Sequence, residues 1–109
     1  MKGIGIDIVS IENLNKEVAD RILSKREMLE FKSYLKTDKE RAMEFLGGRL
    51  ASKEAYLKAI GVSTYDGFSL PDISVYKDEN GVPKFKGISN ARLTVSHDGG
   101  LAVAVVVIE

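Results

Sequence analysis

Asp7 is the first residue whose type and position could support chemistry. It lies inside the apolar run GIGIDIVSI at residues 3–11, and strand interiors disfavour aspartate. If this strand is central, the ionised carboxylate needs a cation or several hydrogen-bond donors, because its desolvation is costly. The alternative is an aspartate at a strand end that caps a backbone group or pairs with a lysine. Taken alone, the position slightly favours this alternative.

Glu54 and Lys58 form a second candidate group, four residues apart in the segment RLASKEAYLKAIG. An exposed ion pair of this spacing contributes only about 0.3–0.5 kcal/mol and is the ordinary interpretation for an arbitrary helix. Leu50 and Leu57 flank Glu54, however, and place its carboxylate near the edge of the core. One aspartate from a strand and one glutamate from a helix suit the oxygen coordination of Mg²⁺, with phosphate oxygens among the other ligands. Two carboxylates alone are a weak indication.

His97 is the only histidine and lies in the run SHDGG at residues 96–100. A single histidine at a turn is more often a surface residue than a catalyst. The chain has no cysteine and no second histidine, which disfavours a zinc site. Ser96 and His97 are sequence neighbours and do not make a nucleophile–base pair, which disfavours a serine hydrolase.

The sequence carries no signature of nucleic-acid or dinucleotide binding. Gly3 and Gly5 precede a predicted strand instead of following one, and there is no Walker A motif. Aromatic residues make up 7% and are scattered, which does not support an RNA-binding sheet. Lys+Arg and Asp+Glu both number 16, so any attraction to a partner must come from local patches. We expect no nucleic-acid partner.

Hydrophobic spacing predicts the elements that position these residues. Residues 3–11 are nearly continuously apolar, which favours a strand with both faces covered. Residues 12–35 show helical spacing with a break near Ser24. Gly47-Gly48 lies inside the next helical segment, where each glycine costs about 1 kcal/mol relative to alanine, so we expect close packing or a bend there.

Capping residues and later strands complete a predicted α+β fold. Asp38 is a suitable N-cap for a long helix over residues 39–60, and Gly61 is a suitable residue to end it. Four strands are then predicted, over residues 73–76, 82–85, 92–96 and 101–108. This order is typical of a mainly antiparallel sheet packed against a long helix.

Length and composition predict a single domain over residues 1–109. Hydrophobic residues make up 44% and charged residues 29%, as in an ordinary globular protein. The apolar stretch at the N-terminus is short and carries Asp7, so we interpret it as a strand and not as a signal peptide. We expect a cytoplasmic protein with no membrane partner, and the lack of cysteine is compatible with a reducing compartment.

Four segments together resemble a known family. These are GIGIDIVSIE at the N-terminus, GRLASKEAYLKAIG in the long helix, DENGVPKF in the middle hairpin and VSHDGGLAVAVVVIE at the end. In this order they resemble the bacterial holo-[acyl-carrier-protein] synthases, the small class of 4′-phosphopantetheinyl transferases, over nearly the whole chain. The resemblance implies that 4′-phosphopantetheine moves from coenzyme A to a serine of apo acyl carrier protein, with release of 3′,5′-ADP, in support of fatty-acid biosynthesis.

The resemblance also implies roles for residues of this chain. Asp7 and Glu54 would be the Mg²⁺ ligands, Glu54 would be the base, and Lys58 would reach the phosphates of coenzyme A. The family's trimers have active sites at subunit interfaces, which implies a homotrimer. Further positions match residues that line the coenzyme A pocket in the family, with His97 near the nucleotide phosphate: Arg49, Gly61, Pro83, Ser96 and His97.

Several segments depart from the family pattern. Ser10 and Asn13-Leu14 stand where relatives carry an acidic residue and an arginine of the helix that docks the carrier. The candidates left for carrier binding are Arg21, Lys25 and Arg26. Gly61-Val62-Ser63 replaces a Gly-Thr-Gly, which would alter the path of the pantetheine arm. Only KGISNA separates Phe85 from Arg92, where relatives usually hold a short helix, so one wall of the nucleotide pocket or of the trimer contact would be rebuilt.

Two other functions compete with this one. The first is a non-catalytic trimeric module that binds coenzyme A or a carrier without transfer, against which the retention of Asp7, Glu54 and Lys58 argues. The second is a metal-dependent phosphohydrolase acting on a nucleotide, which would need more metal ligands than the sequence provides.

Overall fold

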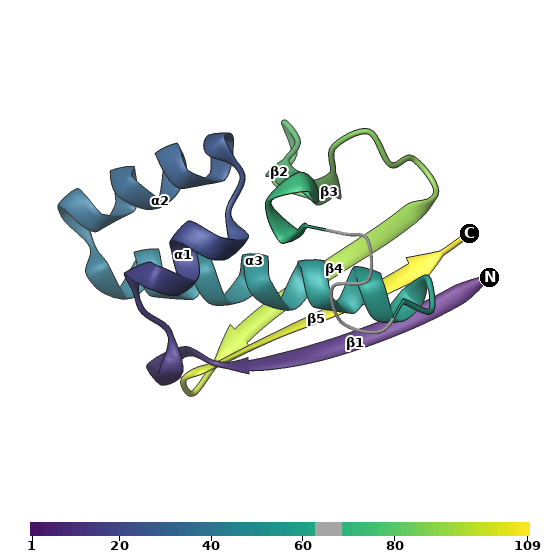
Figure 1. Ribbon diagram of the computed structural model, residues 1–109, viewed down its shortest axis with the longest axis horizontal. Coiled ribbons are helices and arrows are strands. Elements are labelled where there is room, and N and C mark those ends of the chain that lie inside the picture. The colour runs from purple at the N-terminus through teal and green to yellow at the C-terminus, as the bar shows by residue number, and fades with distance from the viewer. Residues whose placement is uncertain (63–68) are drawn as a thin grey trace.

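The computed structural model describes residues 1–62 and 69–109. Figure 1 shows a long helix lying across one face of a three-stranded sheet, with the two termini at the same end of the molecule. The elements follow in the order β1 (Gly3–Ser10), α1 (Lys16–Ile22), α2 (Lys25–Thr37), α3 (Lys39–Ala59), β2 (Val75–Lys77), β3 (Pro83–Phe85), β4 (Ala91–Asp98) and β5 (Leu101–Ile108). Short 3₁₀ turns at Ile11–Asn13 and Leu70–Asp72 join some of them. The α+β architecture predicted from the sequence is confirmed.

The main sheet is antiparallel and has the strand order β1-β5-β4. Its register places Asp7 opposite Ala104, and Ala104 opposite Val95. Strands β2 and β3 form a separate antiparallel hairpin. Because side chains alternate along each strand, one face of the main sheet packs on α3 and the other points away from it.

Glycines allow β1 to lie directly on α3. A Cβ atom on Gly3 would lie 2.0 Å from the Ala59 carbonyl oxygen, and one on Gly5 would lie 2.0 Å from the Ala55 carbonyl oxygen. Strand and helix therefore run in opposite directions along this contact. Asp7 is the next residue of β1 on the same inner face, so it follows Gly5 toward the preceding turn of α3.

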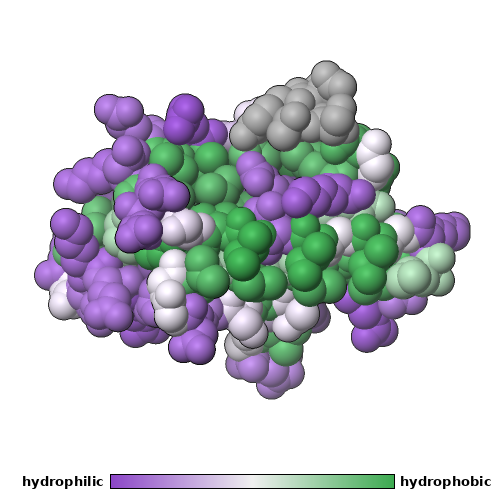
Figure 2. Space-filling view, turned by 90° about the horizontal axis from the view of Figure 1, so that it is seen from below, coloured by the Kyte–Doolittle hydropathy of each residue, from purple (hydrophilic) through white to green (hydrophobic). Residues whose placement is uncertain are grey.

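The outer face of β1 differs from the sequence prediction, which had both faces covered. Ile4, Ile6 and Ile8 are exposed to 59%, 59% and 61% of their surface in the single chain. Figure 2 shows hydrophobic side chains gathered in a row on the face seen from below Figure 1. The apolarity of the strand thus fits burial against something other than this chain's own elements.

The helix ends lie where local capping places them. Ser24 and Glu27 form a capping box at the start of α2, at the predicted break. The Asp38 side chain accepts a hydrogen bond from Arg41 N at 3.1 Å and caps α3. Gly61 follows that helix with φ +79°, as a terminating glycine requires. These three predictions are confirmed.

The predicted close packing at Gly47-Gly48 is also confirmed. A Cβ atom on Gly47 would lie 3.1 Å from Ile11 Cγ1, and one on Gly48 would lie 3.3 Å from Val95 Cγ1. Gly48 therefore lets β4 approach the middle of α3. Among residues 1–62 and 69–109, no helix is long and apolar enough to cross a membrane.

Candidate active site

The buried carboxylate of Asp7 contacts the end of α3. The residue is 8% exposed, and its Oδ1 accepts a hydrogen bond from Lys58 Nζ at 3.0 Å. The same ammonium group donates to the Ile6 carbonyl oxygen at 3.0 Å. Asp7 Oδ2 is buried and has no hydrogen-bond partner among residues 1–62 and 69–109. A buried carboxylate oxygen without a donor is a place where a cation would be stabilised.

Glu54 lies one helical turn before Lys58, on the same side of α3. Because Gly5 lies against Ala55, the next inward residue, Asp7, comes beside the turn of α3 that ends at Glu54. The two carboxylates predicted to bind Mg²⁺ thus come from β1 and α3, which lie in direct contact. Their all-oxygen donor set fits a hard divalent cation, with most ligands left to water and phosphate. In the part of the chain that the structure describes, no group of three or more histidine, aspartate or glutamate residues forms a complete metal site.

Three of the predicted coenzyme A residues line one cavity of about 440 Å³. Arg49 enters it from α3, Pro83 from β3 and His97 from β4. Arg41 and Lys77, which the sequence did not single out, line the same cavity. This concentration of cationic side chains is suited to a phosphorylated ligand.

The Arg49 side chain is almost fully buried at the base of this cavity. Its guanidinium carbon lies 4.4 Å from the centre of the Phe45 ring, and its Nε lies 3.6 Å from Glu27 Oε2 without a hydrogen-bond partner. Burial lowers the pKa of Arg49, and the charge of Glu27 opposes that shift. Arg49 thus places a positively charged group at the cavity wall, fixed by its contacts with Phe45 and Glu27.

Ser96 and Gly61 lie elsewhere in the single chain. Ser96 pairs with Val103 on the outer face of the sheet, opposite to the face that bears its neighbour His97. Gly61 lies beyond the end of α3, and its backbone N–H donates to the Lys58 carbonyl oxygen at 3.2 Å. Neither residue lines the 440 Å³ cavity. The segment Gly61-Val62-Ser63, which was expected to alter the path of the pantetheine arm, ends at Ser63, and that residue lies outside the described residues.

The sequence analysis missed a buried ionic cluster centred on Glu27. Its Oε1 lies 2.5 Å from Lys53 Nζ, and it also accepts from Ser24 N at 2.8 Å. Its Oε2 accepts from Val75 N at 2.9 Å, and Lys53 Nζ also donates to the Ile22 carbonyl oxygen. Burial lowers the pKa of Lys53, and Glu27 opposes the shift. The cluster fixes α1, α2 and β2 to the turn of α3 that carries Glu54.

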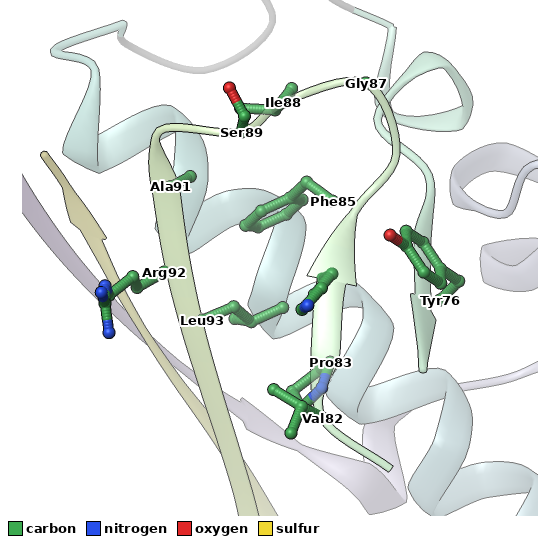
Figure 3. A pocket seen from close by; sticks show the side chains of 11 residues that line it. Tyr76, Val82, Pro83, Phe85, Gly87, Ile88, Ser89, Ala91, Arg92 and Leu93 are labelled. Atoms are coloured by element: carbon green, nitrogen blue, oxygen red, sulfur yellow. The ribbon is translucent and has the colours of Figure 1, made fainter. Parts of the chain in front are cut away.

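A larger cavity of about 890 Å³ lies between β3 and β4, beside the segment between Phe85 and Arg92. Figure 3 shows Phe85 and Leu93 facing this space, whereas Arg92 points away from it. Arg92 Nε pairs with Glu109 Oε1 at 3.1 Å. Of the predicted site residues, Pro83 alone lines this cavity.

Comparison with known proteins gives one consistent result. A family model described as "4'-phosphopantetheinyl transferase superfamily" matches residues 3–106. A holo-[acyl-carrier-protein] synthase from Geobacillus sp. (strain WCH70) is 38% identical over 118 aligned positions, and the alignment covers 98% of this chain and 95% of that protein.

Solved structures agree with this match. A holo-(acyl-carrier-protein) synthase from Bacillus anthracis str. Ames, in complex with CoA (3′,5′-ADP), has a TM-score of 0.85 and 36% identity. The match covers 98% of this chain and 95% of that one. The Helicobacter pylori holo-[acyl-carrier-protein] synthase in complex with coenzyme A has a TM-score of 0.77 and 33% identity, covering 97% and 99%.

The fold and these matches define a phosphopantetheinyl transferase. The chain belongs to the 4′-phosphopantetheinyl transferase superfamily, among the holo-[acyl-carrier-protein] synthases. The family, the fold and the enzyme class predicted from the sequence are confirmed.

Proposed function

We propose that this chain transfers 4′-phosphopantetheine from coenzyme A to a serine of apo acyl carrier protein, with Mg²⁺ held by Asp7 and Glu54. The observation that carries the proposal is the buried, unpartnered Oδ2 of Asp7, on a strand that lies directly on the helix bearing Glu54 and Lys58. A bound Mg²⁺ supplies charge neutralisation at the diphosphate oxygens.

In the proposed reaction the serine oxygen of the carrier attacks the β-phosphorus of coenzyme A. A new phosphorus–oxygen bond forms, the bond to the bridging diphosphate oxygen breaks, and 3′,5′-ADP leaves. Glu54 accepts the serine proton, directly or through one water. Lys58 turns its ammonium group from Asp7 toward the phosphate oxygens and offsets the charge that develops there. Its side chain is 56% exposed, so it can reach a ligand without unfolding its surroundings.

The 440 Å³ cavity is proposed to hold the nucleotide end of coenzyme A. Arg49 and Pro83 would form its floor and side, with His97 near the nucleotide phosphate, and the relative from Bacillus anthracis was solved with a ligand of this class. Ser96 and Gly61 are proposed to contact coenzyme A where subunits meet, because in one chain they lie outside this cavity.

A homotrimer is proposed for the working enzyme. The row of Ile4, Ile6 and Ile8 is an apolar face that a single chain leaves exposed and that a subunit interface would bury. A contact along β1 would also place a neighbouring chain next to the strand that carries Asp7. The shortened segment between Phe85 and Arg92 would then alter a wall of the pocket or of this contact.

Carrier recognition is proposed for Arg21, Lys25 and Arg26, which are all exposed around the start of α2. Arg26 also lies over the Tyr76 ring, with its guanidinium carbon 5.7 Å from the ring centre. These cations suit an acidic partner surface. We propose a cytoplasmic enzyme that serves the carrier of fatty-acid biosynthesis.

The test combines the purified chain with coenzyme A, Mg²⁺ and an apo carrier protein, followed by mass spectrometry of the carrier. We expect one phosphopantetheine on one serine, abolished by a chelator and restored by added Mg²⁺. Binding of coenzyme A with an unmodified carrier would favour the non-catalytic module instead. Release of inorganic phosphate from a nucleotide would favour the phosphohydrolase.

A further inference from the structure

His97 is held by a carboxylate that the predicted mechanism does not use. Its Nδ1 lies 3.2 Å from Glu44 Oε2, and both residues line the 440 Å³ cavity. The His97 side chain is 47% exposed and that of Glu44 is 33% exposed, so both reach the ligand space. An imidazole N–H that faces a carboxylate oxygen at this distance donates to it.

The backbone packing explains why these two residues meet. Gly48 lacks the side chain that would separate α3 from Val95 of β4. Two residues beyond Val95 on the same face of β4 comes His97, and one turn before Gly48 on the same face of α3 comes Glu44. The contact therefore follows from the close approach of two rigid elements, which holds the imidazole in one orientation.

The pairing determines what the other ring nitrogen can do. With Nδ1–H directed at Glu44, Nε2 is the nitrogen left for a ligand in the cavity. When the ring carries a proton on both nitrogens, Nε2 also donates. A phosphate oxygen accepts such a charge-assisted bond.

The other charged groups around the cavity are compatible with this role. Arg41 and Arg49 line it from α3, and Lys77 lines it from β2, so a phosphate meets several cations. Asp38 is the second acid of the lining, and its side chain caps α3 by accepting from Arg41 N. Glu44 is thus the acid of the lining that contacts a ligand-facing side chain.

We propose that Glu44 is a positioning residue: it holds His97 with Nε2 toward the cavity, so that the enzyme distinguishes coenzyme A from its analogue without the 3′-phosphate. This inference rests on the proposed function and assigns the specificity of the same site. If Glu44 did not orient His97, its carboxylate would only repel the phosphate and weaken binding. Removal of its charge should then strengthen the binding of coenzyme A, whereas loss of the positioning role should weaken it.

The test measures the dissociation constants of coenzyme A and dephospho-coenzyme A by calorimetry, with Mg²⁺ and without carrier. We expect the wild type to prefer coenzyme A and Glu44→Gln to reduce that preference about tenfold, the loss typical of one charge-assisted hydrogen bond. In the His97→Ala background, Glu44→Gln should cause no further loss. Glu40→Gln removes the same charge from an exposed position of α3 outside the cavity and should leave the preference unchanged.

A second readout examines His97 in the absence of any ligand. The ¹⁵N chemical shifts of its ring should report a protonated Nδ1 in the wild type and a different distribution of protons in Glu44→Ala. Unchanged shifts would overturn the inference, and so would a Glu44→Gln enzyme with a stronger preference for coenzyme A. A wild type that transfers phosphopantetheine without discriminating the two ligands would overturn it while the proposed function stands. A wild type that binds neither ligand would overturn both.

Discussion

Lys58 Nζ lies 3.0 Å from Asp7 Oδ1 and joins the last turns of α3 to β1 across 51 residues of sequence. The pair is asymmetric, because Asp7 is buried while the lysine side chain is 56% exposed. The lysine ammonium group can therefore move to a ligand, whereas the Asp7 carboxylate, with its unpartnered Oδ2, stays in place. This arrangement supports the proposal that Mg²⁺ takes the place of the ammonium group at Asp7.

Replacement of this carboxylate tests its role in metal binding. Asp7→Asn keeps the size of the side chain but removes the charge, so Mg²⁺-dependent transfer should fall by at least about 10²-fold. Circular dichroism and the thermal midpoint should show a retained fold, as they should for Glu54→Ala, which is expected to be equally inactive. Asp72→Asn changes an exposed aspartate and serves as the control. Full activity of Asp7→Asn would remove Asp7 from the metal site.

The contact that positions Asp7 depends on the absence of a side chain at Gly5. Gly5→Ala would place a methyl group 2.0 Å from the Ala55 carbonyl oxygen and 2.7 Å from Ala59 N, and neither backbone atom can move alone. We expect a loss in the free energy of unfolding of at least about 3 kcal/mol, measured by urea denaturation. Gly48→Ala meets a side-chain atom of Val95 at 3.3 Å, a contact that a shift of a few tenths of an ångström relieves, and it gains helix propensity, so it should cost much less stability than Gly5→Ala. Equal effects of the two substitutions would contradict this account.

Local signals explain which parts of the fold were predictable from the sequence. Ser24, Asp38 and Gly61 mark helix ends through contacts with residues at most a few positions away, so their roles can be recognised without the fold. Residues 12–35 were predicted as helical with one break. The structure adds an extended stretch between the 3₁₀ turn Ile11–Asn13 and α1, which hydrophobic spacing does not detect.

Contacts between distant elements explain what the sequence could not provide. The alternative in which Asp7 pairs with a lysine did not say which lysine, and the structure shows that it is Lys58 at the other end of a contact across 51 residues of sequence. Glu27 was not singled out from the sequence, because nothing local shows that Lys53 would bind it across 26 residues of sequence. The resemblance grouped Ser96 with His97, and only the strand register shows that they lie on opposite faces.

The buried pair of Glu27 and Lys53 makes a separate prediction about stability. Lys53→Met removes the cation that lies 2.5 Å from Glu27 Oε1 and leaves a buried carboxylate without its main counter-charge. The free energy of unfolding should fall by about 3–5 kcal/mol. Lys32→Met changes an exposed lysine of α2 and should have little effect.

Restoration by a second substitution distinguishes lost charge balance from lost packing. Glu27→Gln combined with Lys53→Met removes both charges, so the double variant should recover part of the stability lost in Lys53→Met. Urea denaturation of the four proteins, including the wild type, measures this coupling. If the double variant lost more free energy of unfolding than the two single variants lose in sum, the charge-balance explanation would be contradicted.

The exposed isoleucines of β1 make a prediction about assembly. Ile6 is 59% exposed at the centre of the row formed with Ile4 and Ile8, and an aspartate there would bring an unpaired charge into any interface on this face. We expect the wild type to sediment as a trimer and Ile6→Asp as a monomer with a retained far-ultraviolet spectrum. Leu29→Asp makes the same change at a 72% exposed position on α2 and should stay trimeric. In the proposed trimer a neighbouring chain lies along β1, the strand that carries Asp7. Transfer activity of Ile6→Asp should therefore be lost together with assembly and should return as the protein concentration is raised. A monomeric wild type with full activity at all concentrations would show that this face has another partner.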